Sequence, residues 1–127
     1  MTNNEMKKVV DSYVEAYNNF DIEGMKKDLS ENVVFKNTEN GIITLTTNGL
    51  KEYEEVANSS KDFFSSRKQS ILEYDFGETF AIIYFNFKAI LAVDFNDKLK
   101  KGDEFSVGGK SIFNFDNNRI TVLEDYS

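Results

Sequence analysis

The spacing of apolar residues changes near residue 68, and this change constrains the fold more than any other feature of the sequence. Before it, most apolar side chains recur every three or four residues, the spacing of one face of an α-helix. From Lys68 onward the period is two, the spacing of one face of a β-strand, and it continues to the C-terminus. Such a chain is predicted to pack helices against an antiparallel sheet, in the α+β class.

Three helices are predicted in the first half of the chain. Thr2 and Glu5 form a capping-box pattern at the start of a helix over residues 3–18. Asp21 is expected to be the N-cap of a short second helix. Helical spacing returns after Asn48-Gly49 and predicts a third helix that ends before Ser65-Ser66.

Six strands are predicted, two before the third helix and four after it. The first two flank Asn40-Gly41, a dipeptide that tolerates the positive φ angles of a hairpin turn. Later turns are expected at Gly77-Glu78, near Asn96 and at Asn117-Asn118. The predicted strands cover residues 33–38, 42–46, 68–76, 79–93, 104–115 and 119–126.

The order of these elements resembles the nuclear transport factor 2-like superfamily, which includes ketosteroid isomerases and SnoaL-like polyketide cyclases. The blocks Val9–Asn19, Asp21–Met25 and Leu29–Phe35 carry the resemblance at its start, and it extends over essentially the whole chain. It implies a single domain over residues 1–127 with the cystatin-like cone. In that cone a curved antiparallel sheet wraps around one long helix, with two further N-terminal helices.

The chain has neither cysteine nor histidine. Their absence excludes zinc sites built from these ligands, haem held by His or Cys, and nucleophiles that depend on Cys or on a Ser–His pair. Proton transfer is left to Asp, Glu, Tyr or Lys, and we expect neither a metal nor a cofactor. The formal net charge of -7 argues against nucleic acid and anionic membranes as partners, because phosphate groups are bound through clustered Lys and Arg.

The N-terminal residues lead directly into an amphipathic segment and lack the apolar run of a signal peptide. No segment approaches the length of a membrane span. We therefore expect the protein to be cytoplasmic.

A two-residue turn at Gly77-Glu78 would pair Leu72 with Ile83 and Tyr74 with Ala81. The face that is expected to meet the helices then contains Leu72, Tyr74, Phe76, Ala81, Ile83, Phe85, Phe87 and Ala89. The opposite face mixes apolar and polar side chains: Ile71, Glu73, Asp75, Ile82, Tyr84, Asn86 and Lys88. This mixture favours a homodimer through the outer face of the sheet, and the alternative is an exposed face with scattered hydrophobic residues.

The last hairpin predicts a buried acid. A loop at Asn117-Asn118 would set Phe115 opposite Ile120, Phe113 opposite Val122 and Ser111 opposite Glu124. The apolar members make this face interior, so Glu124 and Ser111 are expected side by side inside the fold, where a carboxyl must find donors or stay protonated. A register shifted by one residue would bury Asp125, Leu123 and Thr121 instead, and we prefer the first because it buries more apolar surface.

Residues 12–18 look like the corresponding helix of ketosteroid isomerases. This resemblance implies that Tyr13 donates to an oxyanion, that the general base falls at Asn37 and that a second acid falls at Ser111. Because Asn37 cannot abstract a proton and Ser111 is a very weak acid, steroid-type isomerisation by that set is not expected. The alternative role of Tyr13 is a core side chain with a satisfied hydroxyl.

We hypothesise an aromatic pocket in which Tyr13 and Glu124 are catalytic. Its predicted ligand-binding residues are Tyr13, Tyr17, Asn37, Phe85, Phe87, Ser111, Phe113 and Glu124. The predicted function is binding of a small hydrophobic or partly polar molecule, with acid/base chemistry of the isomerase, dehydratase or cyclase kind as a further hypothesis. In the structural alternative Glu124 only braces the sheet through Ser111, and in the functional alternative the chain is a noncatalytic dimerisation module with a vestigial pocket.

Overall fold

The computed structural model describes all 127 residues. Three helices precede most of the sheet, as the spacing of apolar residues predicts, and the six strands lie close to their predicted ranges. The elements are α1 (Asn3–Asn18), α2 (Ile22–Lys26), β1 (Leu29–Glu39), β2 (Ile42–Asn48), α3 (Leu50–Lys61), β3 (Phe64–Phe76), β4 (Phe80–Leu91), β5 (Glu104–Asp116) and β6 (Arg119–Tyr126).

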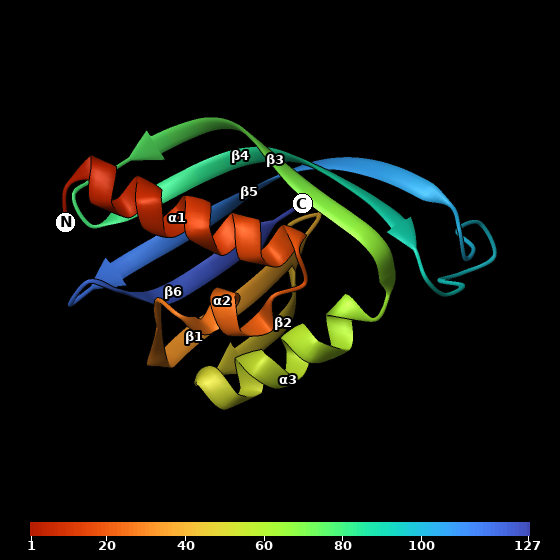
Figure 1. Cartoon of the computed structure of the whole chain (residues 1–127), viewed down its shortest axis with the longest axis horizontal. Helices are drawn as coiled ribbons and strands as arrows, with labels where there is room; N and C mark the ends of the chain where they lie inside the picture. The colour runs from red at the N-terminus through yellow and green to blue at the C-terminus, as the bar shows by residue number, and fades with distance from the viewer.

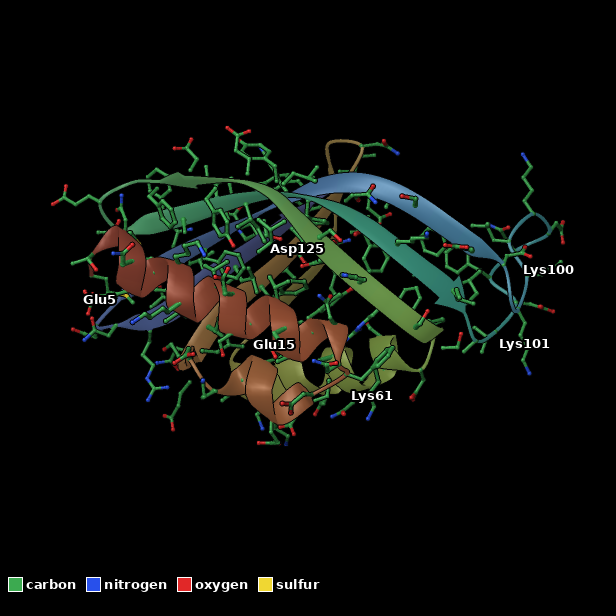
Figure 2. All side chains as sticks on the ribbon, turned by 45° about the horizontal axis from the view of Figure 1, so that its top comes forward. Glu5, Glu15, Lys61, Lys100, Lys101 and Asp125 are labelled. Carbon is green, nitrogen blue, oxygen red and sulfur yellow. The ribbon has the colours of Figure 1, made fainter.

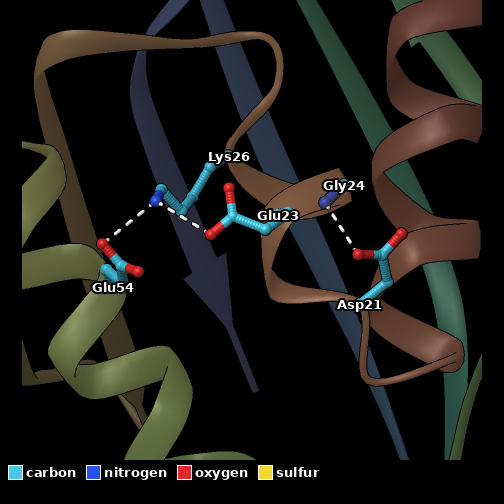
Figure 3. A network of polar contacts seen from close by, with 5 residues as sticks. All are labelled: Asp21, Glu23, Gly24, Lys26 and Glu54. Atoms are coloured by element: carbon cyan, nitrogen blue, oxygen red, sulfur yellow. Dashed lines mark hydrogen bonds and ion pairs between the residues drawn. The ribbon is translucent and has the colours of Figure 1, made fainter.

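The predicted helix caps are present. Thr2 and Glu5 form a complete capping box at the start of α1. The Asp21 side chain accepts a hydrogen bond from the backbone N–H of Gly24 and so caps α2. Lys26, at the end of α2, bridges Glu23 and Glu54 of α3, so that ion pairs join the two helices (Figure 3). These contacts fix the short helix between α1 and α3.

The six strands form one curved sheet in the order β2-β1-β6-β5-β4-β3. All neighbouring pairs are antiparallel except β1 and β6, which run parallel, so the sheet is mixed rather than purely antiparallel as predicted. The parallel pair arises because β1 and β6 are distant in the sequence and need no tight turn between them. The predicted α+β fold with a curved sheet around one long helix is otherwise confirmed.

The sheet curves around α1, which crosses its concave side, and α3 closes the lower edge beside β2 (Figure 1). The helix buries Met6, Val10 and Tyr13 against sheet residues that include Phe113 and Leu123. Burying one large aliphatic or aromatic side chain contributes about 1.5–3 kcal/mol, so this layer stabilises the fold. The convex side of the sheet carries no helix (Figure 1).

The β3–β4 hairpin differs from its predicted register. Tyr74 pairs with Ile83 rather than Ala81, because the turn is centred at Glu78-Thr79, one residue later than predicted, and Leu72 is an extra residue at a bulge. Leu72 is therefore 71 % exposed, whereas the prediction placed it inside. Ile71 packs against the core instead of lying on the outer face.

None of the helices combines the length and the apolar character that a membrane-spanning helix needs.

Candidate functional site

A cavity of about 390 Å³ lies between the concave face of the sheet, α1 and α3. Its walls are mainly hydrophobic, with 14 hydrophobic residues among the 22 that line it, and many of these are aromatic. Exposed residues at its edge, including Glu39, Val107 and Ser127, show where it opens to solvent. The residues lining it are Tyr13, Tyr17, Met25, Phe35, Asn37, Glu39, Leu45, Tyr53, Val56, Ala57, Ser60, Phe64, Arg67, Gln69, Phe85, Phe87, Phe105, Val107, Gly108, Asp125, Tyr126 and Ser127.

The inward-facing acid of β6 is Asp125 and not Glu124. Phe115 pairs with Ile120 as predicted, but Thr121 is an extra residue at a bulge, so Phe113 pairs with Leu123 and Ser111 with Asp125. The bulge combines the two registers that the sequence allows: it keeps Ile120 inside and also buries Leu123. Figure 2 shows Asp125 in the body of the molecule, whereas Lys100 and Lys101 lie at its far end, in the loop between β4 and β5.

Glu124 lies on the other side of β6, paired with Ile112 of β5. Its carboxylate accepts a hydrogen bond from the Tyr126 hydroxyl at 2.6 Å, and it does not line the cavity. The predicted contact between Ser111 and Glu124 is therefore wrong, and the site hypothesis has to be rebuilt around Asp125.

Asp125 is a partly buried carboxyl on the cavity wall. The Ser111 hydroxyl donates to its Oδ1 at 2.6 Å, and Asn37 of β1 is its neighbour in the sheet on the other side. Burial raises the pKa of Asp125 from 3.8 to about 6, because the protein interior disfavours the charged form, and the Ser111 hydrogen bond opposes this only in part. The group can therefore exchange a proton near neutral pH.

Two tyrosines form a hydroxyl pair in the same cavity. Tyr13 of α1 and Tyr53 of α3 lie 2.6 Å apart, oxygen to oxygen. Burial raises the pKa of both phenols above the ordinary value, and the charge of Asp125 acts in the same direction, so both are neutral. One hydroxyl donates to the other, which leaves one O–H hydrogen without a protein partner for a bound molecule.

A buried cation lies toward the β3 side of the cavity. Arg67 is 4 % exposed, and its Nε donates to the backbone carbonyl of Tyr17 at 2.8 Å. Its guanidinium carbon lies 3.7 Å from the centre of the Tyr17 ring, a cation–π contact. Burial raises the pKa of Tyr17 to about 12, although the charge of Arg67 opposes the shift.

The structure brings most of the predicted site residues together. Tyr13, Tyr17, Asn37, Phe85 and Phe87 line the cavity. Two further predicted residues support the wall from behind: Ser111 through Asp125, and the fully buried Phe113 through an edge contact with the Tyr13 ring. Glu124 alone faces away.

The polar residues of the site that were missed include Tyr53, Arg67, Gln69 and Asp125. The helical spacing places Tyr53 on the buried face of α3, and the alternative register of the last hairpin already contains Asp125. The burial of Arg67 and Gln69 could not be predicted from the sequence, because charged and amide side chains are mostly exposed. No three acidic side chains lie close enough together to hold a metal ion.

No model of a known protein family matches the sequence, and no curated protein matches it significantly. Solved structures are similar in fold. A Xanthomonas campestris pv. campestris protein proposed to be a polyketide cyclase has a TM-score of 0.82 at 16 % identity, with 98 % of this chain and 90 % of that chain covered. A Burkholderia pseudomallei NTF2-like protein of unknown function has a TM-score of 0.77 at 15 % identity, covering 98 % and 90 %.

A third structure contains a bound small molecule. It is a Catenulispora acidiphila protein with a ketosteroid isomerase-like fold, in complex with trimethylamine, with a TM-score of 0.76 at 11 % identity and coverage of 94 % of this chain and 85 % of that chain. At these identities the likeness establishes the fold alone, and it confirms the resemblance that the order of elements suggested.

Proposed function

We propose that this chain, which has the nuclear transport factor 2-like fold, binds a small and largely apolar molecule in its aromatic cavity and can move a proton on it through Asp125. The single observation that carries the proposal is a carboxyl of raised pKa on the wall of an open cavity of about 390 Å³. Ligand sites usually occupy about 300–1,000 Å³ and contain few polar groups. The polyketide cyclase suggested for one structural neighbour and the trimethylamine held by another support a small-molecule role.

The arrangement suits proton transfer next to a carbonyl or another electron-withdrawing group. Ionised Asp125 would accept a proton from carbon, and the free O–H of the Tyr13–Tyr53 pair would donate to the oxygen on which negative charge develops. The protonated Asp125 would then return the proton at a second position. Isomerase, dehydratase and cyclase reactions all contain such a step, and the chain's own side chains supply it without a cofactor.

We propose a homodimer through the convex face of the sheet. Ile82, Tyr84 and Ile112 lie there, next to both basic and acidic side chains such as Lys110 and Glu124. A two-fold interface brings the same patch of each subunit together, so a patch with both signs of charge can complement itself. A cytoplasmic location stays a prediction from the sequence.

The alternative function is a noncatalytic association module in which this convex face is the working surface. The open cavity favours ligand binding over this alternative, because a vestigial pocket is expected to be filled by side chains.

Binding is tested with 1-naphthamide, a neutral aromatic probe of suitable shape. Titration followed by NMR should shift the resonances of cavity residues such as Phe85, Phe87 and Tyr17. Shifts confined to the convex face would contradict the ligand-binding proposal, as would the absence of binding of both this probe and its carboxylate analogue, 1-naphthoate, at millimolar concentration.

Proton transfer is tested with 5-nitrobenzisoxazole, which opens to a coloured phenolate when a base removes its carbon-bound proton. Asp125→Asn should reduce the rate by about 100-fold or more, the usual contribution of a positioned general base. Glu124→Gln is the matched control, since it removes the neighbouring carboxylate from the convex face of the same strand. Equal rates for wild type and Asp125→Asn would exclude Asp125 as the base.

A further inference from the structure

Arg67 is a buried cation without an anionic partner. It takes part in none of the ion pairs of the structure, all of which lie on other residues. Its Nε is satisfied by the Tyr17 carbonyl and its Nη2 approaches only the Met25 sulfur, at 3.9 Å. Nη1 has no hydrogen-bond partner in the protein. Thr47 Oγ1 is the only fully buried side-chain polar atom that lacks a partner, so Nη1 must be accessible to a molecule in the cavity.

Gln69, two residues further along β3, is a second buried polar side chain with unused hydrogen-bonding groups. It is 8 % exposed and lies on the same face of the strand as Arg67, on the cavity wall. Its backbone N–H and carbonyl are bonded to Asn18, but its side-chain amide has no hydrogen-bond partner in the protein. Two adjacent polar side chains, each more than nine-tenths buried, therefore present unused donors to one region of the cavity.

Leaving a charge buried and unpaired costs several kcal/mol, which the ring faces of Tyr17 and Phe20 offset only in part. Asp125 does not supply the counter-charge, because no ion pair joins it to Arg67. Asp125 lies on β6 and Arg67 on β3, and the strands β5 and β4 separate these two in the sheet. The cavity thus has an acid toward one end and a cation toward the other.

We infer that the molecule bound in this cavity carries a carboxylate, which Arg67 holds with its guanidinium and Gln69 supports with its side-chain amide. The inference rests on the proposed ligand-binding function and specifies the class of ligand. A carboxylate matches the planar fork of an arginine, and hydrogen bonds between charged groups are about twice as strong as neutral ones. The apolar part of the ligand lies against Phe64, Phe87 and Phe105, which pack around one another beside this region.

The test compares 1-naphthoate with 1-naphthamide, which has the same rings and a neutral head group. Calorimetric titrations are run at about pH 5.5, where an aromatic carboxylate is ionised and Asp125 is mostly protonated. Naphthoate should bind at least about 10-fold more tightly, as expected for a hydrogen-bonded charge. Binding of naphthamide with equal or higher affinity would overturn the carboxylate assignment and leave the ligand-binding proposal intact, whereas failure of both probes would overturn both.

Two variants locate the preference. Arg67→Met should abolish the preference for naphthoate while naphthamide still binds, and the exposed neighbour Lys68→Met removes the same charge outside the cavity and should leave the preference unchanged. Should Arg67→Met fail to fold, Arg67→Lys keeps the charge but loses the fork, and it should reduce the preference. A preference that survives unchanged in the Arg67 variants, or that disappears in Lys68→Met, would refute the assignment to Arg67.

Discussion

Asp125 and Glu124 are consecutive acidic residues, and the protein treats them in opposite ways. Side chains of a strand alternate between its faces, so only one of the two can face the cavity. Asp125 lies in the interior beside Ser111, and Glu124 lies on the convex face beside Tyr126. The electrostatic cost of the interior position raises the pKa of Asp125.

This cost predicts how stability depends on pH. The pKa of Asp125 is about 6 in the folded protein and 3.8 for an unperturbed group, so folding takes up a proton between these values and stability is lost as the pH rises through this window. Asp125→Asn should therefore be more stable than wild type above about pH 6, by up to roughly 3 kcal/mol. Water in the open cavity solvates the carboxylate and makes this difference smaller. Urea denaturation of both proteins between about pH 4 and 8 measures the difference. A constant difference across this range would contradict the raised pKa.

Thr47 offers a second prediction at the scale of a single residue. It is 3 % exposed, and its hydroxyl has no hydrogen-bond partner. Thr47→Val replaces the hydroxyl with a methyl group of similar size and should stabilise the protein by about 1 kcal/mol, since the desolvation cost disappears. Thr46→Val, at an exposed position of the same strand, is the control in denaturant titrations. A loss of stability in Thr47→Val would mean that the hydroxyl is satisfied in solution.

At the scale of elements, bulges set which side chains of the sheet reach the interior. One extra residue at Thr121 lets β6 bury both Ile120 and Leu123, and another at Leu72 turns that leucine outward. A bulge also increases the bend of a strand, which helps the sheet to curve around α1. The cavity lies between this curved sheet, α1 and α3.

Gly109 allows β5 to pass close to its neighbours. A Cβ atom at this position would lie 2.7 Å from the backbone oxygen of Tyr126 and 2.8 Å from a ring carbon of Phe85. Gly109→Ala should therefore destabilise the protein by about 1–3 kcal/mol, the usual cost of overpacking. At Gly108 the nearest atom would be 3.9 Å away, so Gly108→Ala is the control in thermal unfolding. Equal stability of the two variants would show that Phe85 moves aside without cost.

At the scale of the whole molecule, the two faces of the sheet serve different purposes in our proposals. The concave face holds α1 and the cavity, and the convex face carries no helix (Figure 1). The proposed dimer would cover the convex face without obstructing the opening of the cavity, since Val107 and Ser127 at that opening do not belong to the convex patch around Tyr84.

The dimer is tested by light scattering at micromolar concentration. Wild type should have twice the mass of one chain, and Tyr84→Lys should be monomeric because it places a charge in the centre of the apolar patch. Ile42→Lys, in β2 at the tip of the β1–β2 hairpin, where this residue is 68 % exposed, is the control and should remain dimeric. A monomeric wild type would rule out the dimer.

The sequence alone determined the elements, because each is encoded locally. Apolar spacing, the Thr2–Glu5 capping box and the turns at Asn40-Gly41 and Asn117-Asn118 act over a few residues. The predicted ranges overlap those of the structure, although β1 and β3 each begin four residues earlier than predicted and α3 ends before β3 begins at Phe64. The same local spacing places four aromatic residues on the buried faces of their elements, which also line the cavity: Tyr13, Tyr17, Phe85 and Phe87.

Only the tertiary structure decided which acid faces inward and which polar groups the cavity contains. A one-residue bulge reverses the facing of every later side chain, and its position depends on how β6 packs against both β5 and β1. The burial of Arg67 depends on the rings of Tyr17 and Phe20, which lie about fifty residues away in the chain. Contacts between residues so far apart in the sequence form only when the whole chain packs, and no local sequence pattern predicts them.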